Sequence, residues 1–274
     1  MKVFIVGLGL IGASYADKLT QEGYEVYGHD KDASVMEKAK SEGVIHEEST
    51  LAHIKDADLV IIALYPTATI EFLKNTYPMF NETQTITDVC GVKTSLINKI
   101  ETFYPSNLSY LTHHPMAGKE KVGYDYKEGA LFKNANLIIC ETRHTKAKDH
   151  QRLKQLSEAL EFGNVSYLSK EAHDEFIAYT SQLTHVMASA LINTNPSEKT
   201  IGATGDSFKD LTRIANINET LWSELFLDNQ AALIKMIEGF EHNLKAIKDA
   251  IINHDQPALK QLLLKGKKGR AKYE

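Results

Sequence analysis

Residues 3–19 read VFIVGLGLIGASYADKL: an apolar run, then Gly7, Gly9 and Gly12, then an amphipathic segment. In the spacing G-x-G-x-x-G at a strand-to-helix turn, the first glycine permits the tight bend and the second lets a pyrophosphate approach the backbone. The third lets helix and strand pack closely. The helix N-terminus then faces the phosphates. An ordinary strand-to-helix turn can carry the same spacing, so the surrounding sequence must decide.

Residues 1–168 alternate β-type runs with amphipathic helical stretches, the pattern of a mostly parallel sheet wrapped by helices. We therefore predict a doubly wound, Rossmann-type α/β domain over these residues. The expected strands are 2–6, 25–30, 57–64, 83–89, 108–113, 135–140 and 164–169, and helices are expected at 34–43, 67–77, 93–103 and 148–162.

Residues 169–274 lack β-type runs and predict an all-helical substrate and dimerisation domain. Residues 171–194 are apolar on most faces and suit a helix buried within a larger assembly. A second helix is expected from Glu219 to about Asn253, about 50 Å long at 1.5 Å per residue. Such a length favours a partner helix from a second subunit, hence a homodimer; the alternative is a monomer with a kink at Gly239.

Composition narrows the functional class. The 274 residues are 43% hydrophobic and 24% charged, without an apolar run long enough to cross a membrane. A net charge of -5 argues against general nucleic-acid binding, and we interpret the basic segment 265–274 as a solvated terminus. The two cysteines form no disulfide framework or zinc-site spacing, so we expect no metal and a cytoplasmic location.

The context of the glycine turn favours NAD. Asp30 ends the next expected strand, eighteen residues after Gly12, where a carboxylate can accept the adenine ribose hydroxyls and repel a 2′-phosphate. Lys31 could tolerate that phosphate, which keeps NADP open. Asp88 suits either the crevice or a helix cap. The predicted cofactor contacts are Gly7, Leu8, Gly9, Leu10, Ile11, Gly12, Asp30, Leu64, Tyr65, Pro66, Asp88, Gly91 and Lys93.

The stretch LSYLTHHPMAG, from residue 108, ends another expected strand on the crevice side. His113 or His114 would then lie near the nicotinamide, where a neutral imidazole can remove a proton while hydride leaves. In the helical half, His185 suits either a core position or the site. Arg213 suits bidentate binding of a carboxylate or a buried pair with Asp210.

Together, GLGLIGAS, DVCGVKT, THHPMAGKE, TSQLTH, SFKDLTRIA and Trp222 resemble the prephenate/arogenate dehydrogenases of tyrosine biosynthesis over nearly the whole chain. The resemblance implies NAD-dependent oxidative decarboxylation of prephenate to 4-hydroxyphenylpyruvate. Alternatives are arogenate as substrate, or another two-domain hydroxyacid or imine oxidoreductase that uses Lys209. We favour prephenate, because no acidic residue in the candidate site is clearly placed to bind the ammonium of arogenate.

By this resemblance, His114 is the catalytic histidine, His185 a second one and Arg213 the substrate-binding arginine. Glu120 matches an acid used in site contacts or gating, and Trp222 an aromatic of the substrate domain. Two positions depart from the family. Gly91 stands where many relatives have a serine that bonds the catalytic histidine, so Thr112, His113 or a water could orient His114 instead. Gln182 replaces the first histidine of an S-H-x-x-H pair.

Overall fold

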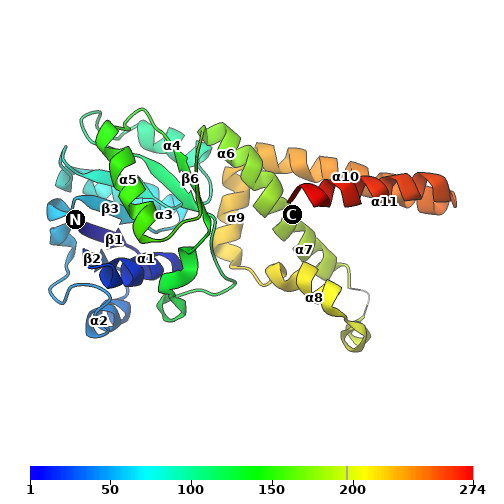
Figure 1. Ribbon diagram of the computed structural model, residues 1–274, viewed down its shortest axis with the longest axis horizontal. Helices are drawn as coiled ribbons and strands as arrows, with labels where there is room; N and C mark the ends of the chain where they lie inside the picture. The colour runs from blue at the N-terminus through cyan, green and yellow to red at the C-terminus, as the bar shows by residue number, and fades with distance from the viewer. Residues whose placement is uncertain (196, 274) are drawn as a thin grey trace. The chain divides into compact units, whose positions relative to one another are not determined.

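The computed structural model describes residues 1–195 and 197–273. Its first sheet is parallel, with strand order β2-β1-β3-β4 (Figure 1). A second sheet has the order β5-β6-β7, with β5 antiparallel to β6. The strands are β1 (Lys2–Val6), β2 (Glu25–His29), β3 (Leu59–Ile62), β4 (Thr85–Asp88), β5 (Thr112–Pro115), β6 (Asn136–Cys140) and β7 (Asn164–Leu168).

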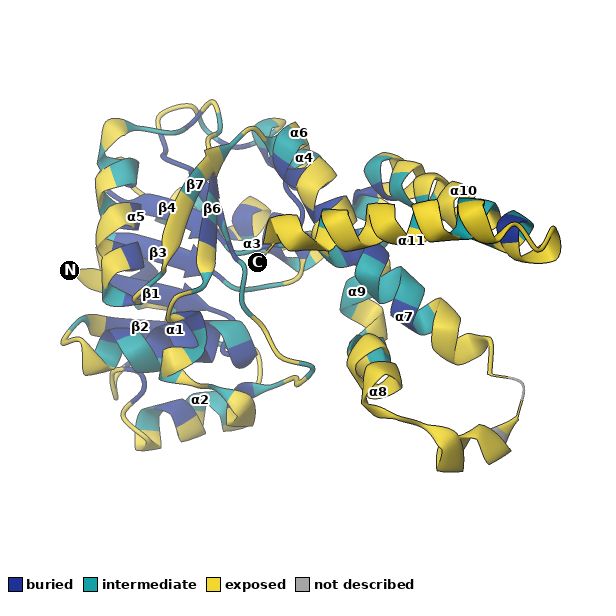
Figure 2. Cartoon of the chain, turned by 45° about the vertical axis from the view of Figure 1, so that its right-hand side comes forward, coloured by how far each residue is buried: buried dark blue, intermediate teal, exposed yellow. Residues whose placement is uncertain are grey.

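Helices cover both faces of the first sheet, because strand side chains alternate between faces. Val3 and Ile5 pack on the face covered by α1 and α5, and Phe4 and Val6 on the face covered by α3 and α4. Strands buried on both sides appear dark blue in Figure 2. The helices are α1 (Leu10–Gln21), α2 (Ala33–Ser41), α3 (Pro66–Thr76), α4 (Thr94–Glu101) and α5 (Ala147–Ala159). This arrangement confirms the predicted Rossmann-type fold.

The strand expected at 108–113 is displaced toward its C-terminal end. Residues 108–111 lie outside the regular ladder, and β5 extends from Thr112 to Pro115. The backbone N–H of Leu111 still donates to the carbonyl of Ile86 at 3.1 Å, which holds β5 next to β4. Both histidines therefore lie inside the strand, on opposite sides of its pleat.

Helices follow β7, as predicted. They are α6 (Lys170–Ile177), a π-helical turn (Ala178–Gln182), α7 (Leu183–Asn193), α8 (Asp206–Thr212) and α9 (Glu219–Asp228). The single helix expected from Glu219 to about Asn253 is wrong, because the chain leaves helical geometry at Asn229. The buried side chain of Asn229 donates to the carbonyl of Asp174 at 2.9 Å and to Oε1 of Gln182 at 2.8 Å. These side-chain bonds hold Asn229 at the end of α9, next to α6 and the π-helical turn.

Contacts divide the chain after Asn229, and the second unit starts at Gln230. It is a hairpin of α10 (Gln230–Ile252) and α11 (Gln256–Arg270), joined at His254 with φ 51°. Gly239 lies inside α10 and is not a break. The basic stretch predicted as a solvated terminus is helical from Lys265 to Arg270, because it continues α11; Glu274 lies outside the described residues.

The outer surfaces of α10 and α11 are largely exposed, as their yellow colour in Figure 2 shows. Their exposed large apolar side chains are Ile234, Leu244, Ile251, Ile252, Leu263 and Leu264. Across the described part of the chain, no helix combines the length and apolarity needed to span a bilayer.

Candidate functional site

The glycine turn after β1 has the geometry that its spacing predicts. Gly7 adopts φ 86°, and a Cβ there would lie 2.5 Å from the carbonyl oxygen of Ala63. A Cβ on Gly12 would lie 1.9 Å from the carbonyl oxygen of Gly7, so α1 packs against the turn only without a side chain. Around Gly9, by contrast, the space is open. The turn therefore leaves an uncovered backbone at the N-terminus of α1, which is what a pyrophosphate requires.

Asp30 follows β2 and lies beside this turn. Its Oδ2 accepts the backbone N–H of Leu8 at 2.8 Å, and its Oδ1 accepts that of Asp32 at 2.9 Å. These bonds fix the carboxylate at the end of β2. Each oxygen keeps a further lone pair with which to accept a ligand hydroxyl.

A cavity of about 970 Å³ extends from the glycine turn to the helices that follow β7. This volume is at the upper end of the range for ligand sites, about 300–1,000 Å³. Among the residues predicted for the site, those that line it are Gly9, Leu10, Ile11, Leu64, Tyr65, Pro66, Gly91, His114, Glu120, His185 and Trp222. The structure thus brings together residues from both halves of the sequence.

His114 faces this cavity, whereas its neighbours Thr112 and His113 do not line it. His113 is fully buried between the hydroxyls of Tyr15, 2.9 Å from Nε2, and Thr87, 2.7 Å from Nδ1. Burial, with a contribution from Lys93, lowers the pKa of His113 to about 3. The prediction that His113 and Thr112 bind substrate is therefore corrected, because both side chains are fully buried and engaged by interior partners, Thr112 by the ammonium of Lys93.

Asp88 and Lys93, predicted as cofactor contacts, instead form a fully buried ion pair at 3.0 Å. The Lys93 ammonium also donates to Oγ1 of Thr112 at 2.5 Å and to the carbonyl of His113 at 2.8 Å. Burial opposes ionisation of Asp88, but Lys93, together with hydrogen bonds such as that from Tyr110, holds its pKa below the usual value. The pair secures β5 and does not line the cavity.

His114 has a partner that the sequence reasoning missed. Its Nδ1 lies 2.9 Å from Nε2 of His173, and Nδ1 of His173 lies 2.8 Å from Oδ1 of Asp174. His173 and Asp174 belong to α6 and are both buried. Burial, followed by His173 and Lys93, lowers the pKa of His114 well below its usual value, which keeps the imidazole neutral at pH 7. The adjacent His-Asp pair in EAHDEF was the available sequence signal.

The helical side of the cavity presents an aromatic pair. His185 stacks on Trp222 with ring centroids 3.7 Å apart, and its Nδ1 donates to the carbonyl of Ser181 at 2.9 Å. Burial lowers the pKa of His185, although the Ser181 carbonyl opposes that shift. A neutral His185 with its proton on Nδ1 presents Nε2 as an acceptor.

Arg213 is exposed and pairs with Glu120, which lines the cavity. Its predicted alternative partner, Asp210, does not make this contact. The pair is mostly solvated, so it constrains the guanidinium only weakly and leaves it available to a ligand carboxylate.

Gly91 and Gln182 are the two positions that depart from the family, and the structure shows what surrounds each of them. A Cβ on Gly91 would lie 3.6 Å from the side chain of Leu225 and 3.7 Å from Cε1 of His114, at ordinary contact distance. Gln182 donates to the carbonyl of Leu225 at 2.9 Å and accepts from Asn229 at 2.8 Å. Glycine thus leaves His114 without a side-chain partner from position 91, and Gln182 is used to hold α9.

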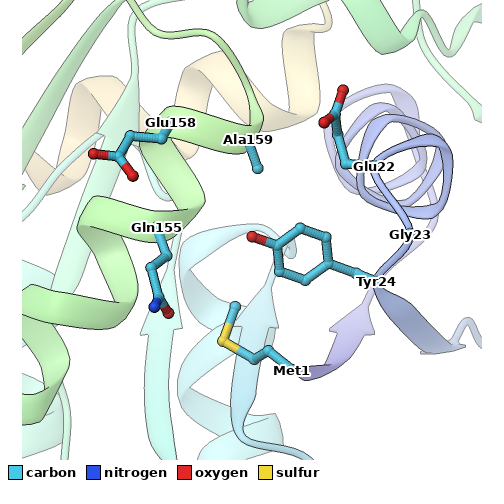
Figure 3. Close-up of a pocket in the computed structure, with 7 residues that line it drawn as sticks. All are labelled: Met1, Glu22, Gly23, Tyr24, Gln155, Glu158 and Ala159. Carbon is cyan, nitrogen blue, oxygen red and sulfur yellow. The ribbon is translucent and has the colours of Figure 1, made fainter.

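A second depression lies between the end of α1 and α5 (Figure 3). Its lining residues are Met1, Glu22, Gly23, Tyr24, Gln155, Glu158 and Ala159. None of them is buried, and Glu22 is already paired with Lys18 at 2.7 Å. The depression offers no enclosed polar group to a ligand, so the large cavity is the candidate site.

Two family models match consecutive parts of the chain. Residues 15–167 match the nucleotide-binding domain of prephenate dehydrogenase, and residues 169–265 match the dimerization domain of prephenate dehydrogenase. The first match corresponds to the Rossmann-type half. The second covers the helices from α6 into α11.

Full-length similarity gives the same assignment. A prephenate dehydrogenase of Lactococcus lactis is 30% identical, over 100% of this chain and 77% of the relative. A cyclohexadienyl dehydrogenase of Zymomonas mobilis is 28% identical, over 98% of this chain and 94% of the relative. The crystal structure of prephenate dehydrogenase from A. aeolicus, in complex with hydroxyphenyl propionate and NAD+, is 31% identical with a TM-score of 0.89. That match covers 100% of this chain and 98% of the other.

Proposed function

Because the chain belongs to the prephenate dehydrogenase family, we propose that it oxidatively decarboxylates prephenate to 4-hydroxyphenylpyruvate with NAD, in tyrosine biosynthesis. The observation that carries the proposal is the shared cavity, in which Gly9 of the nucleotide turn, His114 and the His185–Trp222 pair all face one space. A hydride acceptor, a base and a ring-binding surface have to meet in this way for the reaction.

The residues of the glycine turn fit a dinucleotide. The uncovered backbone at Gly9 suits a pyrophosphate, and Asp30 suits the ribose hydroxyls of NAD better than the 2′-phosphate of NADP. When bound, NAD supplies the hydride acceptor. The A. aeolicus relative holds NAD+ together with a hydroxyphenyl compound, which supports this pairing of ligands.

His114 would take the proton of the ring hydroxyl on Nε2, since its Nδ1 is engaged by His173. Hydride leaves the carbinol carbon of the substrate, and the ring carboxylate departs as CO2, which yields the aromatic product. His185 and Trp222 would flank the ring, and Nε2 of His185 could accept a hydrogen bond from it. Arg213 would bind a substrate carboxylate, because its guanidinium pairs with Glu120, which lines the cavity.

The broader organisation belongs to the same proposal. A boundary at residues 168 and 169 is supported by the two family models, which meet there. A homodimer is supported by the dimerization-domain match and by the exposed apolar side chains of α10 and α11. Cytoplasmic location is supported by two cysteines that are both free and buried. Sedimentation equilibrium of the purified chain would test the dimer.

The direct test is NADH formation by the purified chain with prephenate and NAD+, followed by identification of 4-hydroxyphenylpyruvate. Arogenate and NADP+ are the matched competitors, and His114→Asn is the matched inactive variant. We expect the highest kcat/KM with prephenate and NAD+. If prephenate gives neither NADH from NAD+ nor NADPH from NADP+, the proposal is refuted.

A further inference from the structure

A chain of hydrogen-bonded groups ends at the candidate base, and its two central side chains, His173 and Asp174, are buried. His114 on β5 contacts His173 on α6, His173 contacts Asp174, and Asp174 contacts the start of α4. Oδ1 of Asp174 accepts the backbone N–H of Lys93 at 2.9 Å, and Oδ2 accepts that of Thr94 at 2.8 Å. The carboxylate is therefore fixed by backbone groups that cannot rotate away.

This series of hydrogen bonds determines which nitrogen of each histidine carries the proton. Burial opposes ionisation of Asp174, but its bonds to His173 and Thr94 hold its pKa below the usual value, so it is a carboxylate that only accepts. Nδ1 of His173 must then carry hydrogen, and Nε2 of the neutral ring becomes an acceptor. Nδ1 of His114 must donate to that acceptor at 2.9 Å. Nε2 of His114 is left unprotonated, on a residue that lines the cavity.

We propose that His173 and Asp174 are positioning residues that hold His114 in its base-competent tautomer and receive its Nδ1 proton when Nε2 is protonated. This inference rests on the proposed role of His114 as base. It names the group that supports His114 in a chain with glycine at position 91, where no side-chain hydroxyl can do so.

The proton balance is closed. A proton arriving at Nε2 of His114 is matched by transfer of the Nδ1 proton to Nε2 of His173, which leaves His114 neutral in the other tautomer. His173 then carries the positive charge beside the Asp174 carboxylate, 2.8 Å from Nδ1. No oxidant or further reactant is needed.

The alternative is that His173 is a core histidine whose hydrogen bonds merely satisfy it. The distribution of charge favours the proposed proton relay, in which His173 receives the Nδ1 proton of His114. His114 is partly buried and lies near His113 and Lys93, surroundings that disfavour a cation on its ring. Of the groups aligned on this chain, only Asp174 is anionic, and His173 stands between it and His114. Moving the charge one ring toward Asp174 therefore lowers the cost of protonation.

Two variants of His173 separate the relay from simple packing. In His173→Gln, the amide oxygen can still accept from Nδ1 of His114, but the amide cannot take a proton. His173→Leu removes both capacities. His144→Gln is the matched control, because His144 is a buried histidine that does not line the cavity. Kinetics, melting temperature, NAD+ affinity and the 15N NMR tautomer of His114 are measured for each.

We expect kcat to fall from wild type to His173→Gln to His173→Leu. The largest loss is bounded by the about 10²–10⁴-fold expected for removing a general base. KM for prephenate and NAD+ affinity should stay within about threefold, as they report binding and not proton removal. His114 should hold its proton on Nδ1 in wild type and His173→Gln, and populate both tautomers in His173→Leu. His144→Gln should keep wild-type kcat.

Unchanged kcat in folded His173→Leu would overturn the relay. So would equal losses of kcat and substrate affinity that track melting temperature, since packing alone explains those. A wild-type chain that does not turn over prephenate would remove the proposed function. The tautomer readout would then still decide the positioning claim, because it needs no activity; a His114 protonated on Nε2 would contradict it.

Discussion

Replacing Lys93 with methionine would test the buried network that holds β5. Methionine matches the length of the lysine stem but donates no hydrogen bond. The change removes bonds to Asp88 at 3.0 Å, to Thr112 at 2.5 Å and to the carbonyl of His113 at 2.8 Å. The donors that Asp88 keeps are all neutral: the backbone N–H of Cys90 at 2.9 Å and the hydroxyls of Tyr110 and Thr112. A fully buried carboxylate would then lack a counter-charge.

Removing one partner of a buried ion pair costs about 3–5 kcal/mol, and we expect that loss in the free energy of unfolding at neutral pH. The loss should shrink on acidification. In wild type, the lowered pKa of Asp88 contributes stability above the unfolded carboxyl pKa, which is lost as pH falls through the folded pKa. In the variant, burial without Lys93 raises that pKa, so the protein loses stability as pH rises from about 4. The free energies of unfolding of wild type and Lys93→Met therefore approach each other at low pH.

Urea unfolding gives the free energy of unfolding of four proteins, which together form a double-mutant cycle: wild type, Lys93→Met, Asp88→Asn and the double variant. The neutral amide introduced by Asp88→Asn can accept from Cys90 and donate to Tyr110, so the double variant should be more stable than Lys93→Met by about 0.5–3 kcal/mol. A loss below about 1 kcal/mol in Lys93→Met, or a double variant no more stable than it, would refute the uncompensated-charge argument.

Four further outcomes concern activity. His114→Asn should lower kcat about 10²–10⁴-fold with NAD+ affinity intact, measured by steady-state kinetics and titration calorimetry. Because burial holds the pKa of His114 below its usual value and a base acts unprotonated, wild-type kcat should decline only as pH falls below about 6.5; an acid limb centred above that value contradicts the assignment. Arg213→Ala should raise KM for prephenate, and an unchanged KM refutes carboxylate binding. Asp30→Ala should narrow the preference for NAD+ over NADP+ in kcat/KM; undiminished preference refutes its role.

The sequence predicted the features that depend on local spacing. Gly7 and Gly12 have the strained or crowded positions that the fingerprint requires, and His114 lies in a strand next to a cavity, as expected. These features could be predicted because turn geometry and strand alternation depend on residues a few positions apart. The same holds for the alternation of strands and helices that indicates the fold.

Features that depend on tertiary contacts were not predictable. His173 lies 59 positions from His114, and nothing in the local pattern of EAHDEF indicates that α6 meets β5 there. Asp88 and Lys93 have the residue types of a ligand site, yet they pair with each other in the interior. The break after α9 depends on Asn229, whose hydrogen-bond partners are distant in sequence. Asp174 lies in α6, and Gln182 lies in the π-helical turn that follows it. In each case the deciding bond joins separate elements.

Lys93 connects these tertiary contacts to the base. Its ammonium holds the strand that carries His114, through Thr112 and the carbonyl of His113, while its backbone N–H holds Asp174 at 2.9 Å. The strand that presents the base and the helix that presents its partner are therefore fixed by the side chain and the main chain of one residue. This dual role explains why a lysine at the edge of a nucleotide-binding crevice can be fully buried and still matter for the chemistry. It acts through the geometry of His114 without touching the cavity.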